Sequence, residues 1–568
     1  MPNFTLINLI NKKILNNELR LNLLVALLMI ITASILEVVS IGAFLPFIEI
    51  LLGGKEGLLN NKIIYENNFL SNFLVVIPES KIIIYGIIFF GTIIVFKNII
   101  VFYFHYYREH LNYKIQTNLI NRLFKNIIFK SFENFHQKNS SIYYNLLVRE
   151  SGQTSHSINI FLHLFNEIIV LIFVISFLLM LNAKVTLFLI SIFFLLSLPV
   201  YIFTKEKIRR MSVERINRDQ NMMKNINEAF LLFKYLKVNF LEKFFLNLFN
   251  DNNFKSYNLQ KKMSVLQFLP RYYLEAITVI IFSCILIFIN LNKSSLLNIL
   301  PLIAVFSFAG LRLLPLIKSL VMGLQEIKRG SPSIKAVCDE LLIENSFKEN
   351  FDNKKFKKIQ IKNLNFSYTK NKNLINNFNF EINSGDKILI NGASGSGKTS
   401  LVDILIGIKK YKSGEIKIDD NLIDQSLFKK VKISYVPQDS YLIDDTLKNN
   451  IVFPVQNFEI NDYNKVIEVV DLQNLIKDSP NKENTMIGEK GFKISGGQKQ
   501  RIIIARSLII QPDILVLDEA TNALDINSED SIIQNIIKNY EKMTVFIISH
   551  RKLDQNLFNK TINLGGNN

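Results

Sequence analysis

Three short segments in the second half of the chain combine residue types that could bind and split a nucleotide. The first, Gly392-Ala-Ser-Gly-Ser-Gly-Lys-Thr399, fits the phosphate-loop pattern G-x-x-x-x-G-K-[ST]. Its glycines let backbone N–H groups close around the β- and γ-phosphates, and a helix opening at Ser400 adds its positive end. Lys398 places a cation on the phosphates, and Thr399 offers a hydroxyl to Mg²⁺. The predicted phosphate-binding residues are Gly392, Ala393, Ser394, Gly395, Ser396, Gly397, Lys398, Thr399 and Ser400.

The second segment is the apolar run Ile514–Leu517, which ends in Asp518 and Glu519. Asp518 would hold Mg²⁺ directly or through water, and Glu519 would polarise the attacking water as general base. An apolar strand that ends in two carboxylates is common. These two carboxylates indicate a catalytic site only because they lie about 120 residues after the phosphate loop.

The third segment is Ile494-Ser-Gly-Gly-Gln-Lys-Gln-Arg501, a turn of small residues before an expected helix at Lys499–Leu508. Free N–H groups at a helix start make a second anion site in the same domain. One domain cannot use two separated sites on one nucleotide. The pattern therefore favours two domains paired across a shared nucleotide.

Strand-like and helical stretches alternate around these segments, which predicts an α/β domain with a largely parallel core sheet. About 220 residues remain after Ser346, enough for one such domain with its own core. The expected strands are Lys387–Ile390, Lys432–Val436, Ile514–Leu517 and Thr544–Ile548. We expect a membrane portion at residues 1–330, a linker at 331–355 and an ATP-binding domain at 356–568.

The first 330 residues are unusually apolar. Hydrophobic residues make up 49% of the chain and its mean hydropathy is +0.22, which favours a membrane protein. A membrane-spanning helix needs ~20 apolar residues. Six candidate spans meet this need: Leu23–Leu52, Ile82–Phe104, Ile160–Leu181, Val185–Phe203, Phe268–Asn290 and Leu296–Leu324.

The loops between the spans predict their orientation. His105–Ile158 and Lys205–Lys262 are long and basic, so both should be cytoplasmic, with both termini on the same side. They read as helical extensions of spans two to five. Gly53–Ser80 would be external, with a short surface helix at Phe69–Ile77. The first span is too long for a cleaved signal peptide, and no small-residue cleavage site follows it.

Charge and cysteine content exclude other classes. Lys and Arg exceed Asp and Glu by 66 − 48 = 18, but the excess is not clustered as nucleic-acid binding would require. An AT-rich coding sequence and basic cytoplasmic loops explain the balance. Only Cys284 and Cys338 occur, in settings that favour neither a disulfide nor a metal site.

Together these motifs resemble the ATPase domain of ATP-binding cassette (ABC) transporters, and the six spans ahead of them resemble an exporter-type half-transporter. The implied fold class is a membrane α-helical domain of six transmembrane helices (type I ABC exporter) followed by an α/β P-loop ATPase domain. The implied cofactors are ATP and Mg²⁺. The resemblance covers nearly all of the chain, and Ile494 replaces the usual leucine of the signature.

The resemblance also assigns roles to single residues. It implies that the signature residues close over the γ-phosphate of the opposing subunit's ATP, and that Gln438 senses Mg²⁺. It places Tyr368 on the adenine, Asp525 in the D-loop and Glu489 in an element that touches the coupling helices. His550 is the only histidine after His163 and follows the apolar run Val545–Ile548, where the family places its γ-phosphate contact. The signature residues are Ser495, Gly496, Gly497 and Gln498.

Both halves of an ATP site are intact, so a homodimer with two competent sites is the economical expectation, and a heterodimer stays open. The ATPase motifs do not indicate which molecule is transported, so the cargo must be inferred from the sequence of the membrane half. Lys97 and Arg312 lie roughly 22 and 24 Å into spans two and six at 1.5 Å per residue, and Arg271 begins span five. All three would lie at the level of the inner leaflet, on a cavity that suits a lipid with a dianionic head.

Other interpretations of these cations stay open. Glu275, one turn from Arg271, would neutralise it, and Glu37 in span one would form a buried polar pair. Long basic side chains also reach from a helix end to the interface.

Three further segments resemble the flippase of bacterial protein N-glycosylation (the PglK type): Leu36–Phe47, Leu269–Glu275 and Leu311–Pro315. That resemblance implies flipping of a polyprenyl-diphosphate oligosaccharide across the bacterial inner membrane, with the ATPase domain cytoplasmic. The alternatives are an exporter of another cargo (a lipid A-like glycolipid, peptide or drug) and a nucleotide-gated channel or regulator. The intact Glu519 and signature argue against the last.

Overall fold

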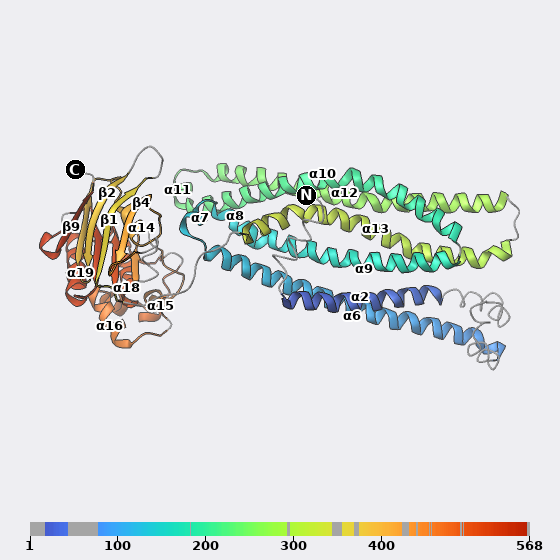
Figure 1. The fold of residues 1–568 in the computed structure, drawn as a ribbon, viewed down its shortest axis with the longest axis horizontal. Coiled ribbons are helices and arrows are strands. Elements are labelled where there is room, and N and C mark those ends of the chain that lie inside the picture. The colour runs from blue at the N-terminus through green and yellow to red at the C-terminus, as the bar shows by residue number, and fades with distance from the viewer. Residues whose placement is uncertain are drawn as a thin grey trace. The chain divides into compact units, whose positions relative to one another are not determined.

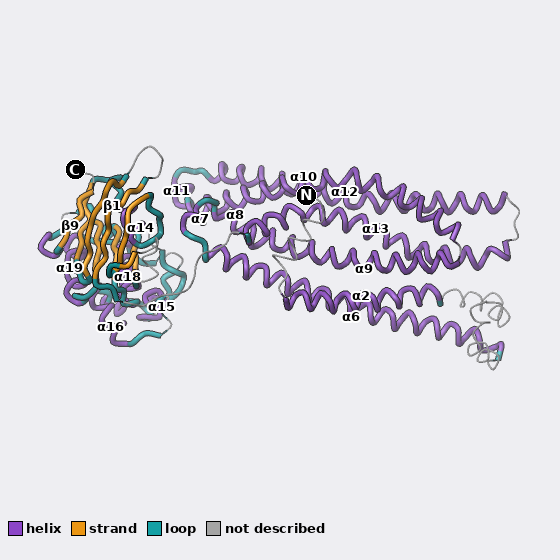
Figure 2. Tube along the Cα trace, viewed as in Figure 1, coloured by secondary structure: helices purple, strands orange, loops and turns teal. Residues whose placement is uncertain are grey.

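The computed structural model describes most of the chain in two compact units. The described residues are 17–43, 78–181, 183–291, 296–342, 355–367, 374–422, 431–438, 441–453, 455, 457–488, 491, 493–551 and 553–564. One unit comprises residues 1–130 and 135–346, and the other comprises residues 131–134 and 347–568. The first is helical and the second is built around β-sheets (Figures 1 and 2).

The helical unit consists mainly of long helices. These are α2 (Asn17–Gly42), α6 (Glu79–Ile128), α9 (Ser151–Leu181), α10 (Ala183–Leu231), α12 (Glu242–Leu291) and α13 (Leu296–Leu341). Its shorter elements are α8 (Ser140–Asn145), a π-helical turn (Leu146–Glu150) and α11 (Phe233–Val238), whereas α7 (Phe132–His136) begins in the segment 131–134 that belongs to the second unit.

Each predicted span falls on one of the long helices, except that the first was expected to continue to Leu52, past the described residues. Among the described residues, three stretches are long and apolar enough to cross a membrane: Asn17–Glu37, Ile83–Ile128 and Ser140–Met180. The expected surface helix at 69–77 lies outside the described residues.

Three of the long helices extend well beyond a bilayer. α6 and α12 have 50 residues each and α10 has 49, which is ~75 Å at 1.5 Å per residue against ~30 Å of hydrocarbon. The basic loops are therefore helical extensions, as predicted. α13 likewise runs on to Leu341, beyond residue 330 where we expected a linker to begin.

A buried ionic network joins four segments of the helical unit where these extensions pack together. Arg215 of α10 donates to Glu150 of the π-helical turn at 3.1 Å and to Asp219 at 3.1 Å. Ser333 of α13 donates to Glu150, and Ser256 of α12 donates to Asp219 at 2.6 Å. Both carboxylates are fully buried and depend for their solvation on these donors, together with Arg149 for Asp219 and Asn145 for Glu150.

Replacing Arg215 by methionine should strongly destabilise the helical unit. The variant leaves Glu150 buried without its cation, which typically costs about 3–5 kcal/mol of unfolding free energy, while Asp219 keeps its ion pair with Arg149. Denaturation of the detergent-solubilised protein should show this loss. The matched control is Arg218→Met on the same helix, whose 3.8 Å pair with Glu214 is partly exposed and should be worth about 0–1 kcal/mol. Equal losses in the two variants would contradict the argument.

The second unit contains two sheets. A four-stranded antiparallel sheet has the order β2-β1-β4-β5, and a five-stranded parallel sheet has the order β6-β7-β8-β3-β9. The first contains β1 (Lys358–Phe366), β2 (Ile375–Asn383), β4 (Ser413–Ile418) and β5 (Asn421–Leu422). The second contains β3 (Lys387–Gly392), β6 (Ile433–Val436), β7 (Ile514–Asp518), β8 (Thr544–Ile548) and β9 (Lys560–Leu564).

The parallel sheet confirms the four predicted strands, whereas the antiparallel sheet was not predicted. Helices pack on the sheets to form two buried cores. They are α14 (Lys398–Leu405), α15 (Leu447–Val452), α16 (Ile460–Val469), α17 (Gln473–Asp478), α18 (Gly496–Ile509) and α19 (Ile526–Asn539), with 3₁₀ turns at Lys482–Asn484 and Gln555–Leu557.

Strand order explains how distant motifs meet. Within the parallel sheet, β8 lies between β7 and β3, so the carboxyl ends of all three strands share one edge. The phosphate loop follows β3, the two carboxylates end β7, and His550 follows β8. Ligands of open α/β sheets bind at this edge.

Candidate functional site

The phosphate loop joins β3 to α14 and depends on its glycines. Gly392, Gly395 and Gly397 have φ values of 156°, 79° and 98°, in a region that side chains rarely adopt. A Cβ on Gly392 would also collide with the carbonyl oxygen of Leu564 on β9. Gly397 is the N-cap of α14, so the loop leads directly into a helix N-terminus.

Two buried polar groups of this loop face its own backbone. Lys398 is 6% exposed, and its Nζ donates to the carbonyl oxygens of Gly392 at 2.8 Å and Ala393 at 3.1 Å. The Ser396 hydroxyl is buried without a hydrogen-bond partner. A buried hydroxyl that lacks a partner needs explaining, and phosphate oxygens held by the loop would satisfy it. The residues of this loop therefore fit the phosphates of a nucleoside triphosphate.

The carboxylate that ends β7 lies beside the loop. Thr399 Oγ1 is 3.4 Å from Asp518 Oδ1, and the Tyr435 hydroxyl donates to Asp518 Oδ2 at 3.0 Å. Asp518 is 2% exposed, and burial raises its pKa, with smaller contributions from the charges of Glu519 and Asp403. A buried carboxylate beside a hydroxyl offers the hard oxygen ligands that Mg²⁺ prefers, and the cation would favour the ionised form.

The candidate general base is held by three donors from different segments. Gln438 and Asn522 donate to Glu519 Oε2 at 2.7 and 2.9 Å, and His550 Nε2 lies 2.7 Å from Oε1. The Glu519 backbone has φ 51°, an uncommon value for a residue other than glycine, and its N–H bonds to Ile548 of β8 at 3.0 Å. The structure thus gathers the predicted residues Gln438, Glu519 and His550. In it Gln438 contacts the base, and its role toward Mg²⁺ stays a prediction.

The signature segment starts α18. Ser495 is its N-cap: its hydroxyl accepts from Gln498 N at 3.3 Å, and the Gln498 side chain accepts from Ser495 N at 2.9 Å. This reciprocal capping box fixes the start of the helix. A cavity of about 490 Å³ opens here, and its lining includes all four predicted signature residues and Asp525.

Residues that the sequence analysis missed connect the signature to the base. Gln500 of α18 accepts from the N–H of Ala523 at 2.9 Å. Arg551, next to His550, donates to the carbonyl oxygens of Leu524 at 2.9 Å and Asn522 at 3.1 Å. Gln500 lies in the signature segment and Arg551 directly follows His550. Their position next to these motifs was the sequence signal that could have identified them. Gln500 therefore links the loop before α19 to the signature helix, and Arg551 links the same loop to the segment that carries His550.

Asp525 has a structural role in addition to its predicted one. As N-cap of α19 it accepts from Ser528 N at 3.0 Å, and hydrogen bonding to Ser528 lowers its pKa. A charged carboxylate at this position is favoured by the helix dipole. Tyr368 and Glu489, predicted for adenine stacking and coupling, lie outside the described residues.

The predicted substrate cations lie in the helical unit, and two of them form ion pairs. Lys97 of α6 lies 3.2 Å from Glu37 of α2 and lines a cavity of about 240 Å³. Arg271 of α12 is exposed and lies 3.1 Å from Glu275. Arg312 is on α13, but its side chain lies outside the described part of the structure. The described contacts do not bring Lys97 and Arg271 together.

Comparison with known proteins gives the same class. The chain superposes on the structure of a bacterial Atm1-family ABC exporter with ATP bound, with a TM-score of 0.71 over 94% of this chain and 92% of the other, at 20% identity. The fold is therefore that of a type I ABC exporter, a helical transmembrane domain with an ABC ATPase domain, as the sequence predicted. Residues 375–522 match the family described as ABC transporter and form its ATPase domain.

Curated relatives match over about a third of this chain. A candidate export ATP-binding/permease protein of Rickettsia typhi is 38% identical over 200 residues, 34% of either chain. The mitochondrial iron-sulfur clusters transporter ATM1 of Debaryomyces hansenii is 38% identical over 197 residues, 34% of this chain and 28% of that protein. The chain thus spans about a third of the length of the curated relatives it matches.

Replacing Tyr435 by phenylalanine should shift the acid side of the pH profile of metal binding. The raised pKa of Asp518 means that its carboxylate is lost on acidification at a higher pH than an ordinary aspartate. Because Tyr435→Phe removes a donor to the charged form, that pKa should rise further, and the acid limb should move to higher pH. Mn²⁺ affinity in the presence of ATP, measured against pH, reports the shift.

The control is Tyr463→Phe in the same domain, because the Tyr463 hydroxyl is buried without a hydrogen-bond partner. Its acid limb should coincide with that of the wild type. If both variants leave the limb in place, the hydrogen bond from Tyr435 does not set the ionisation of Asp518.

Proposed function

We propose that the protein is an ATP-driven exporter that works as a homodimer of half-transporters. The observation that carries this proposal is the Glu519 carboxylate, held by Gln438, Asn522 and His550 at the sheet edge that also presents the phosphate loop. A regulator that only binds nucleotide would not need a general base oriented by three donors. The same arrangement supports ATP hydrolysis coupled to transport.

The chain's own residues account for each part of such a site. The loop N–H groups, Lys398 and Ser396 would hold the β- and γ-phosphates, and Thr399 and Asp518 would hold Mg²⁺, which neutralises charge that develops on the phosphates. Glu519 would take a proton from the attacking water. Its hydrogen bonds to Gln438 and Asn522 orient the carboxylate, and His550 Nε2 at 2.7 Å stabilises its charged form when protonated.

Pairing of two copies follows from where the signature lies. The cavity at Ser495–Gln498 is bordered by the loop before α19 and by Asp471 to Leu475, and no phosphate-loop residue is part of its lining. The N-terminus of α18 therefore offers a second anion-binding surface apart from the first. A second copy whose signature covers the first copy's phosphate loop would complete both sites.

Mixed dimers test whether each ATP site is shared. Lys398→Ala disables the loop, and Gly496→Asp disables the signature, where the added Cβ would meet only Ala523 at an ordinary 3.4 Å. If sites are shared, a dimer with one mutation in each subunit keeps one intact site. A dimer with both mutations in one subunit keeps none. ATP turnover by tandem-purified mixed dimers should therefore survive only in the first case, at about half the wild-type rate or less.

The opposite pattern, with turnover only when both mutations share a subunit, would show that each chain uses its own signature and would overturn the shared site. Each variant is checked as a homodimer, in which neither should hydrolyse ATP.

For cargo we propose a polyprenyl-diphosphate-linked oligosaccharide, or a similar anionic glycolipid, flipped across a bacterial inner membrane with the ATPase domain in the cytoplasm. Support comes from the local sequences at Leu36–Phe47, Leu269–Glu275 and Leu311–Pro315. α8 and α11, at the ends of long helical extensions, are suited to pass movements of the ATPase domain to the membrane helices. The diphosphate would contact protein while the polyprenyl tail stays in lipid.

Glu519→Gln should abolish flipping while leaving ATP binding intact. The amide keeps the size of the side chain but cannot accept a proton, so hydrolysis should fall by about 10²–10⁴-fold. The assay is ATP-dependent flipping of a polyprenyl-diphosphate oligosaccharide in proteoliposomes, with nucleotide binding measured in parallel. Asp530→Asn, which changes an acidic residue of α19 outside the site, is the matched control and should flip at the wild-type rate.

A second candidate is an ATP-driven exporter of a different cargo. It is favoured by the ion pairs of Lys97 with Glu37 and Arg271 with Glu275, which neutralise two of the cations expected to hold a diphosphate. Robust ATP hydrolysis by the wild type without glycolipid flipping would select this candidate.

A further inference from the structure

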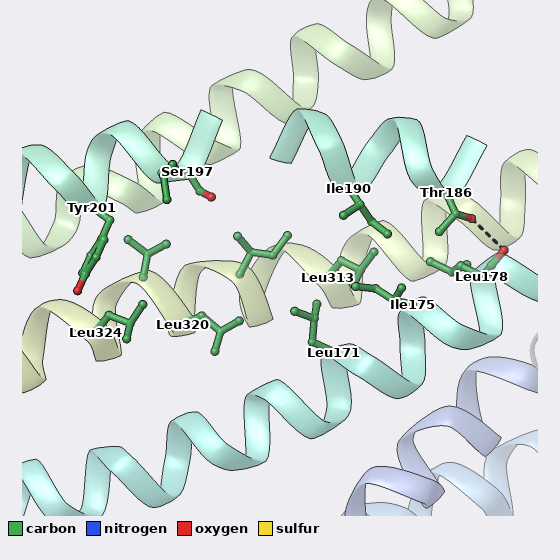
Figure 3. A pocket seen from close by; sticks show the side chains of 13 residues that line it. Leu171, Ile175, Leu178, Thr186, Ile190, Ser197, Tyr201, Leu313, Leu320 and Leu324 are labelled. Atoms are coloured by element: carbon green, nitrogen blue, oxygen red, sulfur yellow. Dashed lines mark hydrogen bonds between the residues drawn. The ribbon is translucent and has the colours of Figure 1, made fainter. Parts of the chain in front are cut away.

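The helical unit contains an apolar pocket between α9, α10 and α13. Its volume is about 270 Å³, and its walls are almost entirely aliphatic (Figure 3). Leu171 and Ile175 come from α9, Ile190 from α10, and Leu313 and Leu320 from α13. Such a lining suits a hydrocarbon chain and offers nothing to a peptide backbone or a sugar, whose polar groups would lose their hydrogen bonds with water.

The two ends of the pocket differ. At one end the Thr186 hydroxyl donates to the carbonyl oxygen of Leu178 at 2.9 Å, which satisfies it within the protein (Figure 3). At the other end lie Tyr201 and Leu324 (Figure 3). From Thr186 to Tyr201 the wall follows 15 residues of α10, ~22 Å at 1.5 Å per residue. The pocket is therefore elongated along the helices.

Just past Tyr201 and Leu324, α10 and α13 are tied together and carry cations. Gln325 donates to Thr204 at 2.6 Å, and both side chains are buried. Lys205 follows Tyr201 by one turn with its Nζ 5.4 Å from the ring centre, and Lys328 follows Leu324 by one turn. This end faces the basic extensions that the sequence places in the cytoplasm.

Positive charge predominates at this end. Burial lowers the pKa of Lys328, and the charges of Lys205 and Arg209 lower it further. Glu206, the carboxylate among them, is shared between Arg209 at 2.6 Å and Arg210 at 3.6 Å. The charge of Lys205 repels that of Lys328, and an external anion beside Lys328 would offset this repulsion.

We propose that this pocket binds a lipid of the cytoplasmic leaflet, with its hydrocarbon chain between α9, α10 and α13 and its phosphate headgroup on Lys205 and Lys328. Aliphatic walls and a basic mouth on the same axis match an amphiphile with an anionic head. A lysine or arginine near an anionic membrane surface is worth about 1 kcal/mol. The site requires only that the helical unit lie in a membrane, so it stands whether or not this lipid is the transported cargo.

The test is lipid binding by the full-length protein in detergent, with phosphatidic acid, phosphatidylcholine and inorganic phosphate as probes, read by native mass spectrometry. Phosphatidic acid should bind at least about tenfold more tightly than phosphatidylcholine, from two or more lysine contacts. Lys205→Gln with Lys328→Gln should remove that preference. The matched control is Lys207→Gln, an exposed residue of the same helix, and it should leave the preference unchanged.

Binding of the lipid's hydrocarbon chain is tested separately, with larger side chains that fill the pocket. Leu320→Trp should weaken binding of both lipids about tenfold or more, and the milder Leu171→Phe should weaken it in the same direction if the first variant folds poorly. Inorganic phosphate that displaces phosphatidic acid completely at comparable concentration would reduce the site to a simple anion site and overturn the proposal. Equal binding of the two lipids, or filled-pocket variants that bind normally, would also overturn it.

Discussion

Charge removed from water has to be compensated, and this constraint explains much of the arrangement of the chain. In the helical unit Glu150 and Asp219 are fully buried, and Arg215 with serines from α12 and α13 solvates them. Because each carboxylate takes donors from different helices, the network fixes which helices lie together. Lys97 and Glu37 apply the same rule between α6 and α2.

The ATPase domain shows where the rule is left incomplete. Lys398 is buried against two carbonyl oxygens of its own loop, Ser396 has no partner, and burial raises the pKa of Asp518. Each group would be better stabilised by a phosphate or a magnesium ion than by the protein alone. The binding site is therefore a set of polar groups that the protein alone compensates only in part. Glu519 differs, because three donors from the protein itself hold its carboxylate.

The sequence predicted what depends on local pattern. The phosphate loop, the carboxylates after β7 and the signature are contiguous motifs, and apolar runs of sufficient length predicted the long helices. It did not predict the antiparallel sheet, although β1 alternates buried and partly exposed residues over its first four positions. Nor did it predict Asn522, Gln500 or Arg551 as supports of the site, because their partners are set by tertiary contacts.

The predicted substrate cations show most clearly which features cannot be predicted from the sequence. Depth along a helix can be counted from the sequence for Lys97 and Arg312, but the sequence left open whether acidic residues such as Glu37 and Glu275 neutralise the cations. Whether a cation can bind an anion depends on its neighbours in the fold. Here Glu37 pairs with Lys97, and Glu275 pairs with Arg271. At Lys205 and Lys328 the balance differs, since the nearby Glu206 is already paired with Arg209 and Arg210. An anionic lipid is thus better matched to Lys205 and Lys328 at the mouth of the α9–α10–α13 pocket than to Lys97, where its charge would compete with Glu37.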